Sequence, residues 1–128
     1  MEAQNMPAAM LRWLNDQEKN SEEAWLLILF RSVLTMIRRQ QPVRLDTDGL
    51  LTASFWKHIE ERLEYSLLEH KKPKAVNLYQ FFHRVADQEK WLLLTSEHAY
   101  LTEEAERFLS QKKEAQLAVI LYHFFPEP

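Results

Sequence analysis

Histidine is the residue type in this chain with the widest chemistry, because imidazole can bind metals and transfer protons near neutral pH. Two of the five histidines have an acidic residue at helical spacing: His58 with Glu61, and His83 with Asp87. A catalytic zinc ion usually has three protein ligands, and the chain has no HExxH-type motif. These pairs therefore indicate ordinary neighbours on helices, and the sequence predicts no metal site.

Other common catalytic arrangements are missing from the sequence. The single glycine, Gly49, cannot supply a glycine-rich phosphate loop or a glycine-flanked serine elbow. Because the chain has no cysteine, it has no thiolate nucleophile, no thiolate metal site and no disulfide. We therefore expect a protein that is not an enzyme, needs no cofactor and has no evident small-molecule substrate.

A basic stretch in the middle of the chain is the best candidate for contact with nucleic acid. No acidic residue lies between His70 and Arg84, and lysines near the start of a helix attract phosphate groups. Asparagine and glutamine side chains can pair with the edge of adenine. The candidate nucleic-acid-binding residues are Lys71, Lys72, Lys74, Asn77, Gln80, His83 and Arg84.

The charge of the whole chain favours a plainer interpretation of these lysines, as a solvated turn before a helix. The net charge is −3, whereas nucleic-acid-binding domains are usually basic. Residues 31–90 carry eleven basic and eight acidic residues, so the excess of negative charge lies at the two ends. A second stretch without acidic residues contains Arg31, Arg38, Arg39 and Arg44. Charge alone leaves both interpretations open.

The clearest helical pattern lies in the first third of the chain. A cap at Ser21, acidic residues after it and arginines at its end predict a helix that runs to Arg39. A shorter helix should begin at Pro7, because proline suits the first helical turn. The apolar stripe of the longer helix falls at helical spacing: Leu26, Leu29, Phe30, Val33, Leu34 and Ile37.

Two more helices are predicted in the middle of the chain. One should start at a cap on Thr52 or Ser54, carry Leu67 on its apolar face and end near His70. The next is expected over about residues 74–88, because apolar residues again recur at helical spacing there. Both helices should turn their apolar faces toward a common core.

β-Structure is expected in two places. Residues 91–95 and 99–102 are rich in apolar and aromatic side chains and flank a short polar turn, which predicts a small hairpin. Residues 43–45 are a candidate for a very short strand. The alternative for the hairpin is an irregular loop or a continuing helix. Thr102 should then cap the last helical segment, in which residues 110–114 predict a kink or a division into two helices.

The expected order is helix, short strand, helix, helix, hairpin, helix, which is the order of a winged-helix domain. The residues LT (94–95) and YLTEEAERFL (100–109) resemble the wing exit of winged-helix families, and VRLDTDGLL (43–51) is similar to their entry into the second helix. The chain most resembles the winged-helix-like domains attached to XPB-type helicases. The resemblance implies a mainly α, winged-helix-like fold with about five helices and a small β-hairpin. The alternative is an all-α bundle without a wing.

The predicted function is that of a non-catalytic interaction module, a protein-binding subunit or adaptor. Abundant aromatic residues, acidic ends and the lack of a catalytic set favour it. The alternative is a dimeric winged-helix DNA-binding regulator that uses residues 71–84 and the hairpin 91–102. The resemblance implies dimerisation through terminal helices, for which the candidate interface residues are Met6, Met10, Trp13 and Phe125.

The chain is expected to form one compact domain overall, with residues 1–20 as an N-terminal helical extension and residues 21–128 as the winged-helix-like domain. Its longest apolar run, residues 24–30, has seven residues, whereas a membrane span needs about twenty. The first ten residues lack the basic start of a signal peptide. We therefore expect a cytoplasmic protein with a protein partner or a second copy of itself, no membrane partner, and nucleic acid as the alternative partner.

Overall fold

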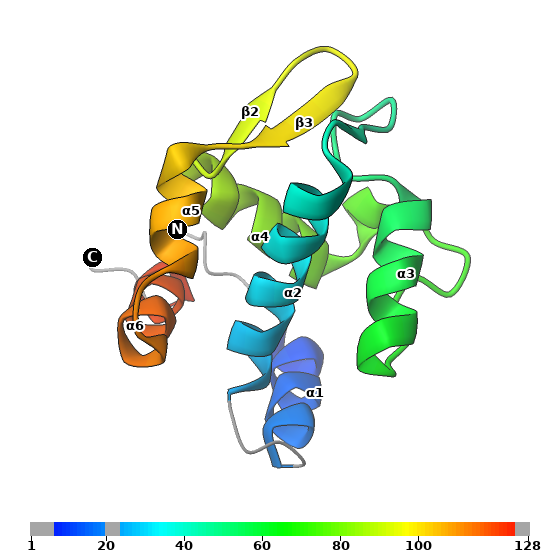
Figure 1. The fold of residues 1–128 in the computed structure, drawn as a ribbon. Coiled ribbons are helices and arrows are strands. Elements are labelled where there is room, and N and C mark those ends of the chain that lie inside the picture. The colour runs from blue at the N-terminus through cyan, green and yellow to red at the C-terminus, as the bar shows by residue number, and fades with distance from the viewer. Residues whose placement is uncertain (1–6, 20–23, 125–128) are drawn as a thin grey trace.

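Helix α2 (Trp25–Gln40) runs through the middle of the structure, and the other elements pack around it (Figure 1). The computed structural model describes residues 7–19 and 24–124. Within these ranges the chain forms six α-helices and a three-stranded antiparallel sheet. The other elements are α1 (Ala8–Lys19), β1 (Val43–Arg44), α3 (Ala53–Leu63), the 3-10 helix η1 (Pro73–Ala75), α4 (Asn77–Gln88), β2 (Leu92–Leu94), β3 (His98–Leu101), α5 (Glu103–Leu109) and α6 (Lys113–Phe124).

The predicted apolar stripe of α2 forms the centre of the core. All six of its residues are buried, and five of them have no exposed surface at all: Leu29, Phe30, Val33, Leu34 and Ile37. The Phe30 ring meets the rings of Phe81 and Phe82 on α4 edge to face, with centroids 6.0 and 5.0 Å apart. The predicted cap at Ser21 lies outside the described residues.

The predicted hairpin is confirmed, which excludes the alternative of a bundle without one. Strands β2 and β3 pair antiparallel, β1 pairs with the other side of β3, and the order in the sheet is β1-β3-β2. The tight turn needs no glycine, because the Thr95 hydroxyl accepts a hydrogen bond from the backbone N–H of His98 at 3.0 Å. A side-chain oxygen of this kind stabilises a turn in place of a special backbone angle.

The end of α3 differs from the prediction. Thr52 caps the helix as expected, with its Oγ1 accepting from the Phe55 N–H at 3.1 Å. The helix stops at Leu63 rather than near His70, and Glu64 takes the left-handed conformation with φ 62°. Leu67 therefore does not extend the helical stripe. The backbone N–H of Leu67 instead donates a hydrogen bond to the side chain of Glu60.

The next helix begins later than predicted. Residues Pro73–Ala75 form a single 3-10 turn, and α4 itself starts at Asn77 and ends at Gln88. The predicted break after residue 109 is confirmed as a division into α5 and α6, so the described residues have six α-helices rather than about five. Thr102 caps α5, with its Oγ1 accepting from the Ala105 N–H at 3.2 Å.

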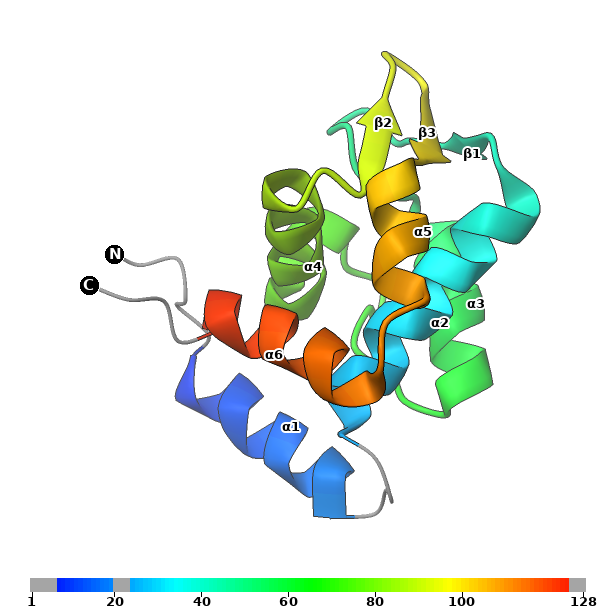
Figure 2. The ribbon, with the colours of Figure 1, turned by 60° about the vertical axis from the view of Figure 1, so that its left-hand side comes forward.

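Helix α6 packs back onto α2 and α4 (Figure 2). Its Ile120 is fully buried, and its Phe124 ring lies edge to face with Phe81 at 5.5 Å. The His123 ring bonds the Glu89 carboxylate at the end of α4 at 2.6 Å. No helix within the described ranges has the length and apolar character needed to cross a bilayer.

A buried carboxylate, that of Glu60, joins α3, the segment after it and α4. Glu60 Oε2 accepts hydrogen bonds from the backbone N–H groups of Leu67 and Leu68, at 3.2 and 2.9 Å, and from the Tyr79 hydroxyl at 2.5 Å. The Tyr79 ring stacks on Trp56 of α3, with centroids 3.8 Å apart. Burial raises the pKa of Tyr79, so its hydroxyl keeps the proton that it donates. This network fixes the α3–α4 connection without regular secondary structure.

We predict that Glu60→Ala lowers the free energy of unfolding by about 3 kcal/mol, because it leaves buried donors without an acceptor. The matched control is Glu61→Ala on the exposed side of the same helix, which should change stability by less than about 0.5 kcal/mol. Urea unfolding followed by tryptophan fluorescence measures both. Equal stability of the two variants would contradict the role given to Glu60.

Candidate interaction surface

The lysines predicted to bind nucleic acid lie just before α4, and all three are exposed. Lys71 and Lys72 are exposed in the segment that leads into η1. Lys74, within η1, has its Nζ 3.7 Å from Asp48 Oδ1 in the turn after β1. The positive charge at the entry to α4 is therefore partly offset by a carboxylate from another segment.

The predicted polar face of α4 is present but carries few charges. Asn77 and Gln80 are exposed one turn apart, and the Gln80 amide donates to the backbone carbonyl of Lys74. The Arg84 guanidinium lies over the Phe81 ring, 5.9 Å from its centroid. Asp87, one turn further on, adds an exposed acid. The helix therefore presents a mixed polar face rather than a basic one.

His83 turns inward from this face. Its Nε2 accepts a hydrogen bond from the backbone N–H of Leu51 at 3.2 Å, so the ring is neutral in the folded protein. Burial lowers the pKa of His83 to about 4, and the nearby Asp46 carboxylate opposes that shift. The structure therefore places this predicted contact residue between α4 and the segment before α3, where it holds the two together.

The predicted interface residues of the N-terminal helix divide into two groups. Met6 and Phe125 lie outside the described residues. Met10 and Trp13 are half-buried and pack on the core of the same chain. The Trp13 ring meets the rings of Trp25 and Tyr65 edge to face, with centroids 5.1 and 5.6 Å apart. These contacts account for the apolar face of α1 within one chain.

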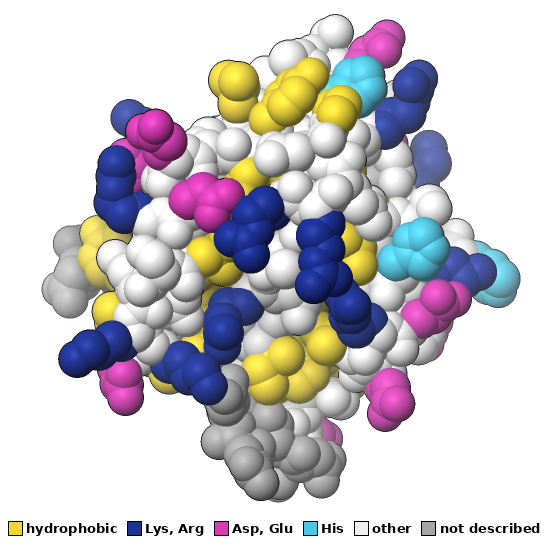
Figure 3. All heavy atoms as spheres, in the orientation of Figure 1, with side chains coloured by type: hydrophobic (Ala, Val, Ile, Leu, Met, Phe, Trp, Pro, Cys, Tyr) yellow, Lys and Arg dark blue, Asp and Glu magenta, His cyan; other side chains and the backbone are white. Residues whose placement is uncertain are grey.

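The hairpin exposes leucines that the sequence did not single out. Leu93 and Leu94 on β2 are 59% and 45% exposed, more than any other described leucine. β2 is also an edge strand, since β3 lies on one side of it only. Figure 3 shows hydrophobic side chains over the hairpin at the top of this face. No lysine or arginine lies between Trp91 and Thr102, so the hairpin combines exposed leucines with a polar turn that carries no basic side chain of these two types.

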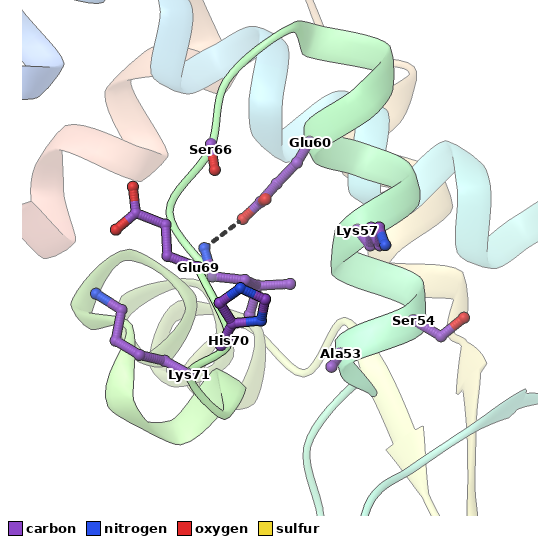
Figure 4. Close-up of a pocket in the computed structure, with 9 residues that line it drawn as sticks. Ala53, Ser54, Lys57, Glu60, Ser66, Glu69, His70 and Lys71 are labelled. Carbon is purple, nitrogen blue, oxygen red and sulfur yellow. Dashed lines mark hydrogen bonds between the residues drawn. The ribbon is translucent and has the colours of Figure 1, made fainter.

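A pocket of about 570 Å³ lies between α3 and the segment that follows it (Figure 4). Glu60 forms part of its lining, next to the bond that it accepts from Leu68. Lys57, His70 and Lys71 also line it. The Glu60 carboxylate in this lining is already engaged by three donors. The exposed Lys71 and the Glu60 carboxylate, which bonds to Tyr79 of α4, therefore line the same pocket.

Neither the grouping of possible metal ligands nor comparison with known proteins points to a function. Among the described residues, no group of three or more histidine or acidic side chains is placed to hold a metal ion. No protein-family model, curated protein or solved structure matches this chain. The surfaces themselves are therefore the observations from which function must be inferred.

The burial of His83 predicts a dependence of stability on pH. Because the folded-state pKa of about 4 lies below the ordinary value of 6.5, the unfolded chain binds a proton in this range that the folded ring does not. The free energy of unfolding should fall by up to about 3 kcal/mol between pH 6.5 and pH 4 from this group. His83→Gln keeps an acceptor that does not titrate, so its stability should fall less steeply. Urea unfolding of both proteins across this pH range tests the prediction. If the free energy of unfolding falls equally in both, the prediction is refuted.

Proposed function

We propose that this chain is a non-catalytic interaction module with a winged-helix-like fold that binds a protein partner, as a subunit or adaptor. The fold proposal is supported by the order α2, β1, α3, α4, β2, β3 and by the sheet order β1-β3-β2. In this assignment α4 is the helix that would enter a DNA groove, and the β2–β3 hairpin is the wing.

The single observation that carries the choice of a protein partner is the chemistry of the wing. Its exposed side chains include Leu93 and Leu94, and its turn carries Glu97. A wing with exposed leucines and no lysine or arginine gains little from a phosphate backbone, but it can bury its leucines against another protein. As an edge strand, β2 also offers backbone N–H and C=O groups to a partner strand.

The arrangement of the arginines also supports this choice. DNA binding would be favoured if Lys71, Lys72 and Arg84 shared a face with the arginines of α2. Arg39 instead lies one turn after Thr35, on the side of α2 opposite Phe30. The Phe30 ring contacts the rings of Phe81 and Phe82 on α4. Helix α4, which carries Arg84, and Arg39 therefore lie on opposite sides of α2, which does not favour one footprint for a duplex.

A dimeric DNA-binding regulator remains the second candidate. The observation that favours it is the exposure of Lys71, Lys72 and Asn77 at the entry to α4. A helix start with nearby lysines is suited to contact with a phosphate group. A cytoplasmic location stays a prediction under either candidate, based on the sequence alone.

Fluorescence anisotropy with labelled duplex DNA separates the two candidates. At about 50 mM salt, where phosphate contacts are strongest, we expect no saturable binding below roughly 100 μM protein. Binding that weakens at about 200 mM salt, and that is lost in the triple variant Lys71→Ala, Lys72→Ala, Lys74→Ala, would favour the DNA-binding regulator instead.

Photo-crosslinking tests the protein-binding role directly. A photoreactive benzophenone amino acid in place of Leu93 should capture a protein in cells of the source organism, because the wing would lie against the partner. The same amino acid in place of Glu114, an exposed residue at the start of α6, is the control and should not capture it. Equal capture at both positions, or adducts with nucleic acid alone, would count against a protein-binding wing.

A further inference from the structure

The outer side of α2 carries a stripe of three polar residues and one isoleucine that points away from the core. Ile28, Ser32, Thr35 and Arg39 follow one another at helical spacing. None of them is buried, whereas Phe30 on the opposite side of the helix has no exposed surface. The stripe therefore lies on a side of α2 that the core leaves open.

Two clefts run along this stripe, at the side of α2 that faces α3. One, of about 320 Å³, is lined by Ile28, Arg31, Ser32, Thr35, Arg39 and Arg62. The other, of about 440 Å³, is lined by Met36, Arg39, Gln40, His58, Glu61 and Arg62. Because Arg39 of α2 and Arg62 of α3 line both clefts, the two join into one groove. We call it the arginine groove.

The arginine groove has an excess of positive charge. Glu61 is its one acidic lining residue, against the three arginines Arg31, Arg39 and Arg62. Arg39 and Arg62 form no ion pair with any residue that the structure describes, unlike their neighbour Arg38, which bonds Glu106 at 3.0 Å. Figure 3 shows lysine and arginine side chains gathered over the centre of this face.

We infer that the arginine groove binds an acidic segment of the partner protein. A guanidinium group matches a carboxylate with two parallel hydrogen bonds, and the hydroxyl groups of Ser32 and Thr35 supply further donors between the arginines. Ile28 gives the groove an apolar contact for a side chain between the acids. The inference rests on the proposed function, and it adds the chemistry of the partner.

The length of the groove limits the size of this segment. From Ile28 to Gln40 the helix rises by roughly 18 Å, at 1.5 Å per residue. That length fits about five or six residues of extended chain, or about three turns of helix. A segment with two or three acidic residues can therefore reach both Arg39 and Arg62.

A single-stranded nucleic acid is the competing occupant, and the lining argues against it. Single strands bind where aromatic side chains stack on bases, and neither cleft is lined by phenylalanine, tyrosine or tryptophan. The chain as a whole carries a net charge of −3, which repels a long polyanion. The binding of a short acidic peptide depends more on the nearby arginines of the groove than on the net charge of the whole chain.

A labelled peptide tests the inference on the full chain. The probe is a fluorescein-labelled twelve-residue peptide in which glutamate alternates with leucine, with a glutamine-for-glutamate peptide as its partner control. Fluorescence anisotropy at low salt should show binding of the glutamate peptide only, and the affinity should fall as salt is raised. The double variant Arg39→Gln, Arg62→Gln should bind it at least about tenfold more weakly.

The matched control is the double variant Arg44→Gln, Lys72→Gln. It loses the same charge from exposed positions that line neither cleft, so it should bind the peptide like the unaltered chain. Far-UV circular dichroism confirms that both variants fold. The inference is overturned if both double variants lose the same affinity, if the unaltered chain fails to bind at about millimolar peptide, or if a twelve-nucleotide oligothymidine binds more tightly through the same arginines.

This outcome is separable from that of the proposed function. Capture of a protein at Leu93, together with no binding of the glutamate peptide by the unaltered chain, would keep the interaction module and reject the groove. Peptide binding with no capture at Leu93 would keep the groove and reject the wing as a contact surface.

Discussion

The carboxylate of Glu60 is the contact on which the arrangement of α3, α4 and the chain between them depends. Three donors converge on one of its oxygens: two backbone N–H groups from the segment after α3, and the hydroxyl of Tyr79 from α4. A buried carboxylate with its donors in place costs little, but the same donors without it are left unpaired. The stack of Trp56 on Tyr79 adds an apolar contact beside the polar one.

Both proposed surfaces follow from this arrangement. α3 supplies Arg62 to one wall of the arginine groove, and α4 carries the polar face whose entry holds the exposed lysines. Between them, α2 has two different sides, since Phe30 packs into the aromatic core and Arg39 lies in the groove. A chain with a negative net charge thereby keeps a local positive surface, next to an apolar hairpin on the same face (Figure 3). A protein partner with an acidic segment and an apolar patch would match both features.

Local patterns allowed much of the fold to be predicted from the sequence. The stripe of α2, the caps at Thr52 and Thr102 and the hairpin depend on residues close together in the chain, so their spacing was informative. The end of α3 was not predictable in this way. Glu60 is one of the acidic residues of α3, and only the folded chain brings its carboxylate to Leu68 and Tyr79.

The surroundings of the candidate site residues were likewise not predictable from local sequence patterns. Periodicity identifies which side of a helix is apolar, but not which element covers its border positions. His83 lies at such a border and is covered by the backbone of Leu51, and Trp13 is covered by Trp25. In the run Leu92–Leu94, three identical residues gave no signal as to which would face solvent. The arginine groove joins residues of two helices more than twenty positions apart, which no local pattern contains.

Amide hydrogen exchange at Leu68, measured by NMR spectroscopy, tests the central claim most directly. Leu68 lies in a segment without helix or strand, where backbone amides normally exchange fast. If the Glu60 carboxylate organises this connection, the Leu68 amide should exchange nearly as slowly as the core amides of α2. Exchange as fast as that of an exposed loop would contradict the account, because the positions of α3 and α4 would then depend on other contacts.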